Sequence, residues 1–265
     1  MYFDSHVHSA VSPDSEMDPI LAIAALDHMG LGITFTEHAD FTTPTHGRDM
    51  SANDAPQIAG DFVVDFERYH SEYRPLRTNT TLLGLEIALT AAFLPLNTQL
   101  AAVDYDFILG AVHSVDGIDI YNDASKYEPQ AFCRHYLTYA ADMVKKCGFF
   151  DSFAHVDYPA RYCNNVAQWF WYENYPDEFD GLLRAIADRG VAMEINTSRF
   201  GNNAVERDLL LIYQRFKALG GQFVTIGSDA HELCRLGCYH DRALAMAHTA
   251  ALTPVYFKER KRIVC

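Results

Sequence analysis

The segment YFDSHVH at residues 2–8 decides how the fold is predicted from this sequence. Its apolar start predicts a strand, and side chains two residues apart in a strand share a face. Asp4, His6 and His8 would therefore all point the same way. Polar groups on one face of a strand could lie in water or could begin a metal site, and residues 2–8 alone leave both interpretations open.

Strand-like and helix-like segments alternate along the rest of the chain. The further strands are expected at GITFTEH (32–38), TLLGLEIAL (81–89), DFILGAVHS (106–114), DSFAHVDYP (151–159), VAMEINTS (191–198) and QFVTIGSDAH (222–231). Helices are expected at 19–30, near 58–74, from about 128 to 147, at 178–190 and at 206–221. Nearly all-apolar strands that alternate with helices predict a parallel α/β fold, and seven such units favour a barrel over an open sheet.

The composition predicts one soluble domain over residues 1–265. Hydrophobic residues make up 49% of the chain, enough for a large core, and α/β barrels of this length are routinely single domains. The net charge of −14 argues against a general nucleic-acid-binding surface, which needs a basic patch. We find no signal peptide, no apolar run near the ~18 residues of a membrane helix and no CxxC pair. We therefore expect a cytoplasmic protein with reduced thiols and no membrane partner.

Chemically active side chains gather where the predicted strands end. In a β/α barrel these carboxyl ends carry the chemistry. The residues there are His6, His8, Glu37, His38, Glu86, His113, His155, Asp157, Glu194, Asn196, Asp229 and His231. Buried and unpaired, such groups would cost several kcal/mol each, whereas metal ions would satisfy them together. Mixed imidazole and carboxylate ligands suit Zn, Mn or Fe, and sites with two metals typically serve hydrolysis.

The ordered motifs resemble those of the polymerase and histidinol phosphatase (PHP) family. They are HVH at 6–8, EH at 37–38, GLE at 84–86, the histidine at 113, AHVD at 154–157 and SDAH at 228–231. The resemblance spans almost the whole chain. It implies a distorted, TIM-like barrel of seven β/α units, with a cluster of two to three divalent transition metals at the carboxyl ends of the strands. The chain length and two arginines are most similar to the histidinol-phosphatase branch.

The resemblance also implies a role for individual residues. One metal would be held by His6, His8, Glu86 and Asp229, and a second by Glu86, His113 and His155. A third would be held by His38, His231 and Asp14, where other family members have histidine. Arg161 and Arg199 would grip the phosphate of the substrate, because a guanidinium binds two phosphate oxygens at once.

The implied reaction is hydrolysis of a small phosphate ester, most specifically L-histidinol phosphate in histidine biosynthesis. A metal-bound hydroxide would attack phosphorus, and Asp229 or His231 could protonate the leaving oxygen. Asp40 and Asp157 are expected to orient the histidine rings, and Asp4 is a further candidate for such an outer role. The aromatic and acidic stretch at 169–180 could receive the imidazole and ammonium of the substrate, or could pack against the barrel.

Three other functions stay open at this point. A PHP protein acting on another phosphomonoester or on nucleotide phosphodiesters would have the same metal site. A non-catalytic barrel would have a degenerate site, which the full ligand set disfavours. An amidohydrolase-type barrel would need a lysine at a strand end, and none lies in the seven predicted strands. The sequence leaves the oligomeric state open.

Overall fold

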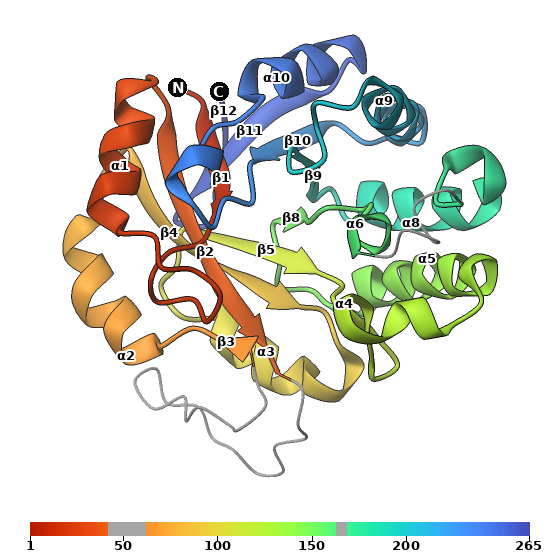
Figure 1. Ribbon diagram of the computed structural model, residues 1–265, viewed down its shortest axis with the longest axis horizontal. Coiled ribbons are helices and arrows are strands. Elements are labelled where there is room, and N and C mark those ends of the chain that lie inside the picture. Colours follow the sequence, from red (N-terminus) through yellow and green to blue (C-terminus); the bar gives the residue numbers. More distant parts are fainter. Residues whose placement is uncertain (42–61, 163–168) are drawn as a thin grey trace.

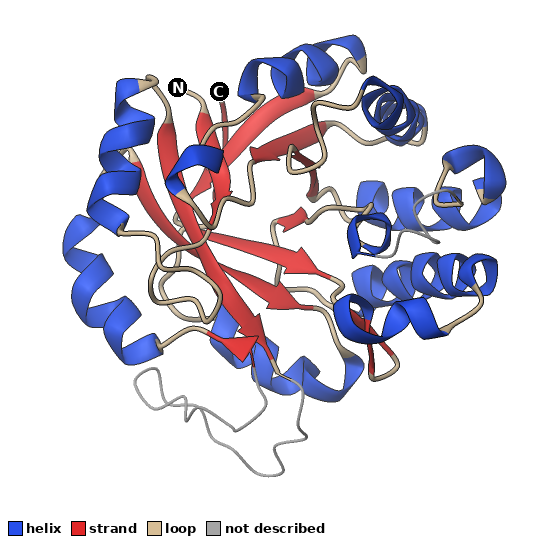
Figure 2. Cartoon of the chain, in the orientation of Figure 1, coloured by secondary structure: helices blue, strands red, loops and turns tan. Residues whose placement is uncertain are grey.

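Strands occupy the middle of the molecule, and helices surround them (Figures 1 and 2). The computed structural model describes residues 1–41, 62–162 and 169–265. Seven strands pair in parallel in the order β1 (Phe3–Val7), β2 (Gly32–Asp40), β4 (Thr81–Ala88), β5 (Phe107–Ala111), β8 (Ser152–Phe153), β9 (Ala192–Asn196) and β10 (Phe223–Gly227). They are the seven predicted strands, and they are almost fully buried, as their apolar sequences require.

The predicted TIM-like barrel is not confirmed, because the sheet does not close. The paired order runs on from β10 to a hairpin of β11 (Thr253–Lys258) and β12 (Lys261–Val264). At the start of β10, Phe223 and Val224 pair with β11, so this edge is already taken where β1 would have to join. Between the described parts of β1 and the segment after β10, the strand pairing is a single isolated bridge, Val7 to Ala230.

Helices cover the outside of the sheet. They are α1 (Pro19–His28), α2 (Phe66–Arg68), α3 (Leu94–Ala101), α4 (Ile120–Asp123), α5 (Pro129–Lys146), α6 (Pro159–Tyr162), α8 (Pro176–Asp188), α9 (Asn203–Ala218) and α10 (His240–Thr249). The helices predicted to start at 19, 128, 178 and 206 each begin within three residues of that position, whereas the helices at 94–101, 120–123 and 159–162 were not predicted. The Asp18 side chain caps α1 by accepting from the backbone N–H groups of Ile20 and Leu21. None of the described helices is long and apolar enough to cross a membrane.

Shorter elements fill the connections. They are β3 (Phe62–Val63), β6 (Ser114–Val115), β7 (Ile118–Asp119), a π-helical turn at Tyr69–Tyr73, and 3₁₀ turns at Arg74–Leu76, Ala91–Phe93, Ala124–Lys126, Tyr172–Asn174 and Leu233–Arg235. The helix predicted near 58–74 is therefore α2 continued by irregular turns, and its first residues lie outside the described part. The elements α10, β11 and β12 lie beyond residue 231, where the sequence predicted no helix or strand.

The strand predicted at 151–159 is much shorter than expected. Its regular pairing ends at Phe153, and Pro159 begins α6. Proline at the first position of a helix has no N–H to lose, so it favours a helix start over a continued strand. The residues in between, including His155 and Asp157, lie in a turn above the end of the sheet.

Candidate metal centre

All nine predicted ligands lie at the carboxyl edge of the parallel strands. His6 lies in β1, His38 in β2 and Glu86 in β4, and the others follow strand ends or lie in the loop before α1: His8, Asp14, His113, His155, Asp229 and His231. Strands that run in parallel end at the same edge, so the topology alone brings these residues together.

The Glu86 carboxylate lies at the centre of the cluster. Its Oε1 atom is 2.7 Å from Nε2 of His155 and 3.2 Å from Nε2 of His113. Its Oε2 atom is 3.1 Å from Nδ1 of His38, 3.3 Å from Nε2 of His6 and 3.5 Å from Nε2 of His8. The two oxygens therefore face different groups of histidines, an arrangement that can bridge two metal ions.

Asp229 completes the group around His6 and His8. Its Oδ1 atom is 3.3 Å from Nε2 of His6 and 3.4 Å from Nε2 of His8, and these two nitrogens are 3.0 Å apart. The backbone of Asp229 has φ of +58°, in the left-handed region, where aspartate is one of the better-tolerated residues. The Asp229 N–H donates to the His6 carbonyl over 2.8 Å, which holds this conformation against β1.

Asp14, His38 and His231 form the third group, nearest to solvent. Asp14 Oδ2 is 2.7 Å from Nε2 of His231 and 3.5 Å from Nε2 of His38. The ring of His8 stacks between those of His38 and His231, with centroids 4.1 and 4.3 Å away. The Asp14 side chain is 34% exposed, the highest value among the nine predicted ligands.

The donor set fits divalent metal ions. The Glu86 Oε2 and His38 Nδ1 atoms are buried and make no hydrogen bond in the described part of the chain. The nitrogens of His6 and His8 face each other with carboxylates around them, so one shared cation would satisfy all of them. Nitrogen and oxygen donors together suit zinc, manganese or iron.

The pKa shifts show how protons and metal ions would compete here. Burial favours the neutral form of His113, but Asp40 and Glu86 outweigh it and raise the His113 pKa to about 10. Burial, together with the charge of His38, lowers the pKa of His8 to about 3. Burial opposes the charge of Glu86, yet the surrounding histidines hold its pKa well below the usual range. The site thus keeps its carboxylates ionised, and bound cations would displace the ring protons.

Asp4, Asp40 and Asp157, the three carboxylates predicted to support the ligands without binding metal, have different contacts. Asp40 Oδ2 lies 2.5 Å from Nδ1 of His113, a position from which it can orient that ring. Asp4 contacts no ligand ring, and instead accepts from the backbone N–H groups of Ser228 (2.8 Å) and Gly237 (2.9 Å). Asp4 therefore holds the loop that carries Asp229.

Asp157 differs from the expectation that it orients a histidine ring. Its Oδ2 atom accepts from Nη1 of Arg199 over 2.9 Å, and Oδ1 is 4.0 Å from Nη2 of Arg161. The two-residue alternation that would align Asp157 with His155 does not apply, since β8 has ended at Phe153. The two arginines hold the pKa of Asp157 below its usual value although burial opposes this.

Of the two predicted phosphate-binding arginines, Arg161 contacts the metal ligand Asp229, whereas Arg199 contacts Asp157, and neither is among the described residues that line the cavity over the ligands. Arg161 is nearly buried, with 6% of its side chain exposed, and its Nη1 donates to Asp229 Oδ2 over 2.5 Å. Its Nε and Nη2 groups make no hydrogen bond among the described residues. A buried guanidinium with free N–H groups next to a metal site is suited to receive an anion.

Sequence reasoning missed the role of Glu194. It named Glu194 at a strand end but gave it no function, although its fully buried carboxylate contacts the site. Glu194 Oε1 accepts from Nδ1 of His6 over 2.6 Å, and Oε2 accepts from the backbone N–H of His155 over 2.8 Å. The spacing of Glu194 and Asn196 did indicate that the Glu194 side chain faces the site, because residues two apart at the end of a strand share one face. Glu37, by contrast, accepts from Ser9 and Ser12 and faces away from the cluster.

A cavity of about 640 Å³ opens over the metal ligands. One wall is an aromatic ladder formed by Tyr158, Tyr162 and Tyr121. The ring centroid of Tyr158 lies 4.6 Å from that of His113, the Tyr162 centroid lies 5.1 Å from that of Tyr158, and the Tyr121 centroid lies 4.9 Å from that of Tyr162. Asp119 also lines this side. The described lining includes no residue of the 169–180 stretch, whose Phe170, Tyr175 and Phe179 are buried in the core.

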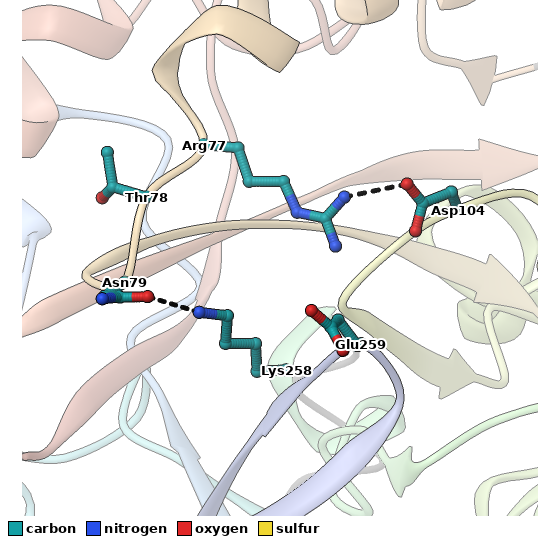
Figure 3. A pocket seen from close by; sticks show the side chains of 6 residues that line it. All are labelled: Arg77, Thr78, Asn79, Asp104, Lys258 and Glu259. Atoms are coloured by element: carbon teal, nitrogen blue, oxygen red, sulfur yellow. Dashed lines mark hydrogen bonds and ion pairs between the residues drawn. The ribbon is translucent and has the colours of Figure 1, made fainter.

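A second hollow, of about 510 Å³, lies at the opposite end of the sheet (Figure 3). Its polar side chains contact one another: Arg77 Nη1 donates to Asp104 over 3.0 Å, and Lys258 donates to the amide oxygen of Asn79. The described residues that line it include no histidine or cysteine. The metal-ligand chemistry of the described chain thus gathers at the carboxyl ends of the strands.

Comparison with known proteins assigns the family. Residues 4–198 match the model of the PHP domain, which is more than half of the chain. The chain belongs to the PHP domain family. The PHP match begins at Asp4, in β1, and extends past the end of β9, so it includes seven of the nine predicted ligands.

Relatives of this PHP protein carry related names. It is 36% identical over 265 residues to a probable histidinol-phosphatase of Clostridium acetobutylicum, with 98% of each chain covered. It is 32% identical over 239 residues to a histidinol-phosphatase of Lactococcus lactis, covering 86% of this chain and 83% of the relative. Its structure matches a Lactococcus lactis histidinol phosphate phosphatase complexed with zinc, L-histidinol and phosphate. That match has a TM-score of 0.84 and 27% identity, covering 99% and 98% of the two chains.

Proposed function

We propose that this protein is a metal-dependent phosphomonoesterase that hydrolyses L-histidinol phosphate to L-histidinol and phosphate. The observation that carries the proposal is the cluster of predicted metal ligands, eight of which fall into groups that could hold a metal ion, beside a buried arginine whose Nε and Nη2 make no hydrogen bond among the described residues. The histidinol-phosphatase names of relatives that match almost the whole chain support it, as does the relative solved with zinc, L-histidinol and phosphate.

We propose two to three divalent transition metals, held as the three groups of side chains suggest. His6, His8, Glu86 and Asp229 would hold one ion, Glu86, His113 and His155 a second, and Asp14, His38 and His231 a third. Bound metals supply Lewis acidity and lower the pKa of water. The protein would hold the ligands at fixed spacing at the strand ends, and Arg161, which contacts Asp229, would bind the phosphate.

The chain offers two candidates to protonate the leaving oxygen. Asp229 and His231 both line the cavity. Burial opposes ionisation of Asp229, but the charges of His6 and Arg161 hold its pKa well below the usual range, so it starts ionised. Asp14 and Asp229 raise the pKa of His231 against the effect of burial, which favours the protonated form of this ring when no metal is bound to it. We therefore propose His231 as the donor in a centre whose third ion is absent.

The cavity wall suits a substrate with positive charge. Tyrosine faces attract cations, and the aromatic ladder of Tyr158, Tyr162 and Tyr121 leads from the histidine ligands to the surface. Asp119 lies on the same side. L-Histidinol phosphate carries an ammonium and an imidazole that such a wall could receive. We infer that the wall, and not the stretch at 169–180, gives the preference for this ester.

Chelation and a substrate panel test the proposal. Exhaustive chelation should abolish phosphatase activity, and added zinc, manganese or iron should restore it. Among L-histidinol phosphate, p-nitrophenyl phosphate and nucleotide phosphodiesters, the first should have the highest kcat/KM. Full activity of protein shown by elemental analysis to be free of metal would contradict the metal mechanism. A preference for a nucleotide diester would support the alternative substrate class instead.

A further inference from the structure

We propose that Glu194 is the positioning residue that holds two metal-ligand groups at a fixed distance from each other. It does so by orienting the ring of His6 and anchoring the backbone of His155. The inference rests on the metal centre of the proposed function. It assigns a role to a carboxylate that would contact no metal ion itself.

The contacts of Glu194 reach β1 and the segment that follows β8. Glu194 lies on β9, and its Oε1 atom accepts from Nδ1 of His6 on β1 over 2.6 Å. Its Oε2 atom accepts from the backbone N–H of His155 over 2.8 Å and from Nδ2 of Asn196 over 3.1 Å. His6 belongs to the ligand group of Asp229, and His155 belongs to that of His113. One carboxylate therefore ties the two groups together.

Gly227 leaves the space through which Glu194 reaches His6. Gly227 ends β10, which pairs with β9, and a Cβ atom at Gly227 would lie 2.3 Å from Glu194 Oε1 and 2.3 Å from Cβ of His6. Any side chain at residue 227 would push these two residues apart. The contact thus depends on an arrangement of three strands.

The hydrogen bond also selects which nitrogen of His6 faces the metal position. A carboxylate oxygen 2.6 Å from Nδ1 of His6 favours the tautomer in which Nδ1 carries the proton and Nε2 keeps its lone pair. That Nε2 atom is 3.3 Å from both Glu86 Oε2 and Asp229 Oδ1. By comparison, the Nδ1 atoms of His8 and His155 make no hydrogen bond among the described residues. His6 is the ring that Glu194 orients, and His113 is the ring that Asp40 orients.

The test is the Glu194→Gln variant, with metal affinity as the measurement. Glutamine has one acceptor and one donor end, so it cannot accept from both His6 and the His155 N–H, and one end would meet a donor. We expect zinc affinity, measured by competition with a chromophoric chelator, to fall about 10- to 100-fold. A folded Glu194→Gln variant, judged by circular dichroism, with wild-type zinc affinity would overturn the proposal.

Asp106→Asn is the matched control. Asp106 is also a fully buried carboxylate of the same sheet, and it accepts from Arg77 and from backbone N–H groups at the opposite end. We expect Asp106→Asn to lower Tm while zinc affinity stays unchanged. An equal loss of affinity in both variants would mean that Glu194 acts only through general stability, and would contradict a positioning role.

Two further measurements complete the design. In a His6→Ala background, Glu194→Gln should reduce zinc affinity by less than it does in the wild type. If the two substitutions reduce zinc affinity independently, so that their free-energy effects add, Glu194 does not act through His6. If Glu194→Gln fails to fold, nitrogen-15 NMR of the zinc-loaded wild type decides, because Nδ1 of His6 must carry a proton. A wild type that binds no zinc would overturn the proposed function as well, whereas wild-type affinity in Glu194→Gln overturns this inference alone.

Discussion

At the scale of single residues, Asp14 is where the ligand set departs from the histidine of the family pattern. A carboxylate is shorter than an imidazole and carries a charge, and Asp14 has the most exposed side chain of the nine. Its close contact is with His231, at 2.7 Å, whereas His38 is 3.5 Å away. The third group is thus the least enclosed part of the centre, and we expect its metal to exchange most readily.

Removing the charge of Asp14 should therefore affect one metal ion selectively. In Asp14→Asn we expect about 10- to 100-fold weaker binding of a single ion, with the remaining ions unchanged. Elemental analysis after dialysis against a graded series of chelator concentrations measures this. An equal loss of every metal would contradict the division into groups. The matched control is Asp18→Asn, at the helix cap in the same loop.

Arg199 is the second residue whose role can be isolated. Its guanidinium is held by Asp157, which contacts no ligand ring. Loss of one charge-assisted hydrogen bond, worth ~1.5–3 kcal/mol, corresponds to a roughly 10- to 150-fold rise in KM for Arg199→Ala. Metal content should not change. Loss of metal in this variant would instead give Arg199 a structural role. The exposed Arg207 provides the control, as Arg207→Ala should leave KM unchanged.

At the scale of elements, a charged contact joins α8 to α9 on the side of the molecule away from the cavity lining. Asp180 Oδ1 accepts from Nε of Arg215 over 2.8 Å and from the hydroxyl of Tyr172 over 3.0 Å. The hydrogen bond from Arg215 is the main cause that lowers the Asp180 pKa below its usual 3.8, although burial opposes it. A lowered carboxyl pKa stabilises the fold at a pH above the unfolded value, and this stabilisation is lost as the pH falls through the folded value.

The lowered pKa of Asp180 gives a prediction about the pH dependence of stability. Asp180→Asn should lower Tm at pH 7, and the wild-type and variant Tm values should converge as the pH falls below about 3.8. Thermal unfolding followed by circular dichroism across that range measures the difference. A Tm difference that stays constant down to the lowest pH would show that charge is not involved. Asp188→Asn, an exposed position in the same helix, should have little effect at either pH.

At the scale of the whole molecule, the ligands come from six different strands or the segments that follow them. Metal ions would therefore join parts of the chain as distant as β1 and the segment after β10, where the sheet itself makes only an isolated bridge. Ligands that bind only the folded state stabilise it by mass action. The metal centre should thus strengthen the place where the sheet fails to close.

Metal removal should lower the stability of the whole fold. Free zinc at a thousand times Kd contributes ~4 kcal/mol, which corresponds to a fall in Tm of roughly 10 °C on chelation. Thermal unfolding with and without chelator measures this, and restored zinc should recover the original Tm while added magnesium should not. An unchanged Tm after verified metal removal would contradict a centre that joins the strands.

Much of the site was predictable because it depends on local spacing and parallel topology. His6 and His8 are two residues apart on one strand, and all seven predicted strands are present. Parallel strands end together, so the strand-end motifs had to meet. The role of Glu194 was not predictable, because it needs a gap at Gly227 and a distance across three strands. The contacts of Asp157 depended on where β8 ends, which alternation alone does not reveal.

The sequence by itself determined which predicted strand carries each motif and which ligand types the motifs supply. It also determined the sheet edge where these ligands gather, because side-chain alternation and strand direction fix that edge. Only the tertiary structure decided that the sheet stays open, because Phe223 and Val224 are already paired with β11. It also decided that Phe170, Tyr175 and Phe179 of the 169–180 stretch belong to the core and that the aromatic ladder of Tyr158, Tyr162 and Tyr121 belongs to the cavity. Such choices depend on which distant segments compete for the same edge or face, and local sequence patterns carry no information about that competition.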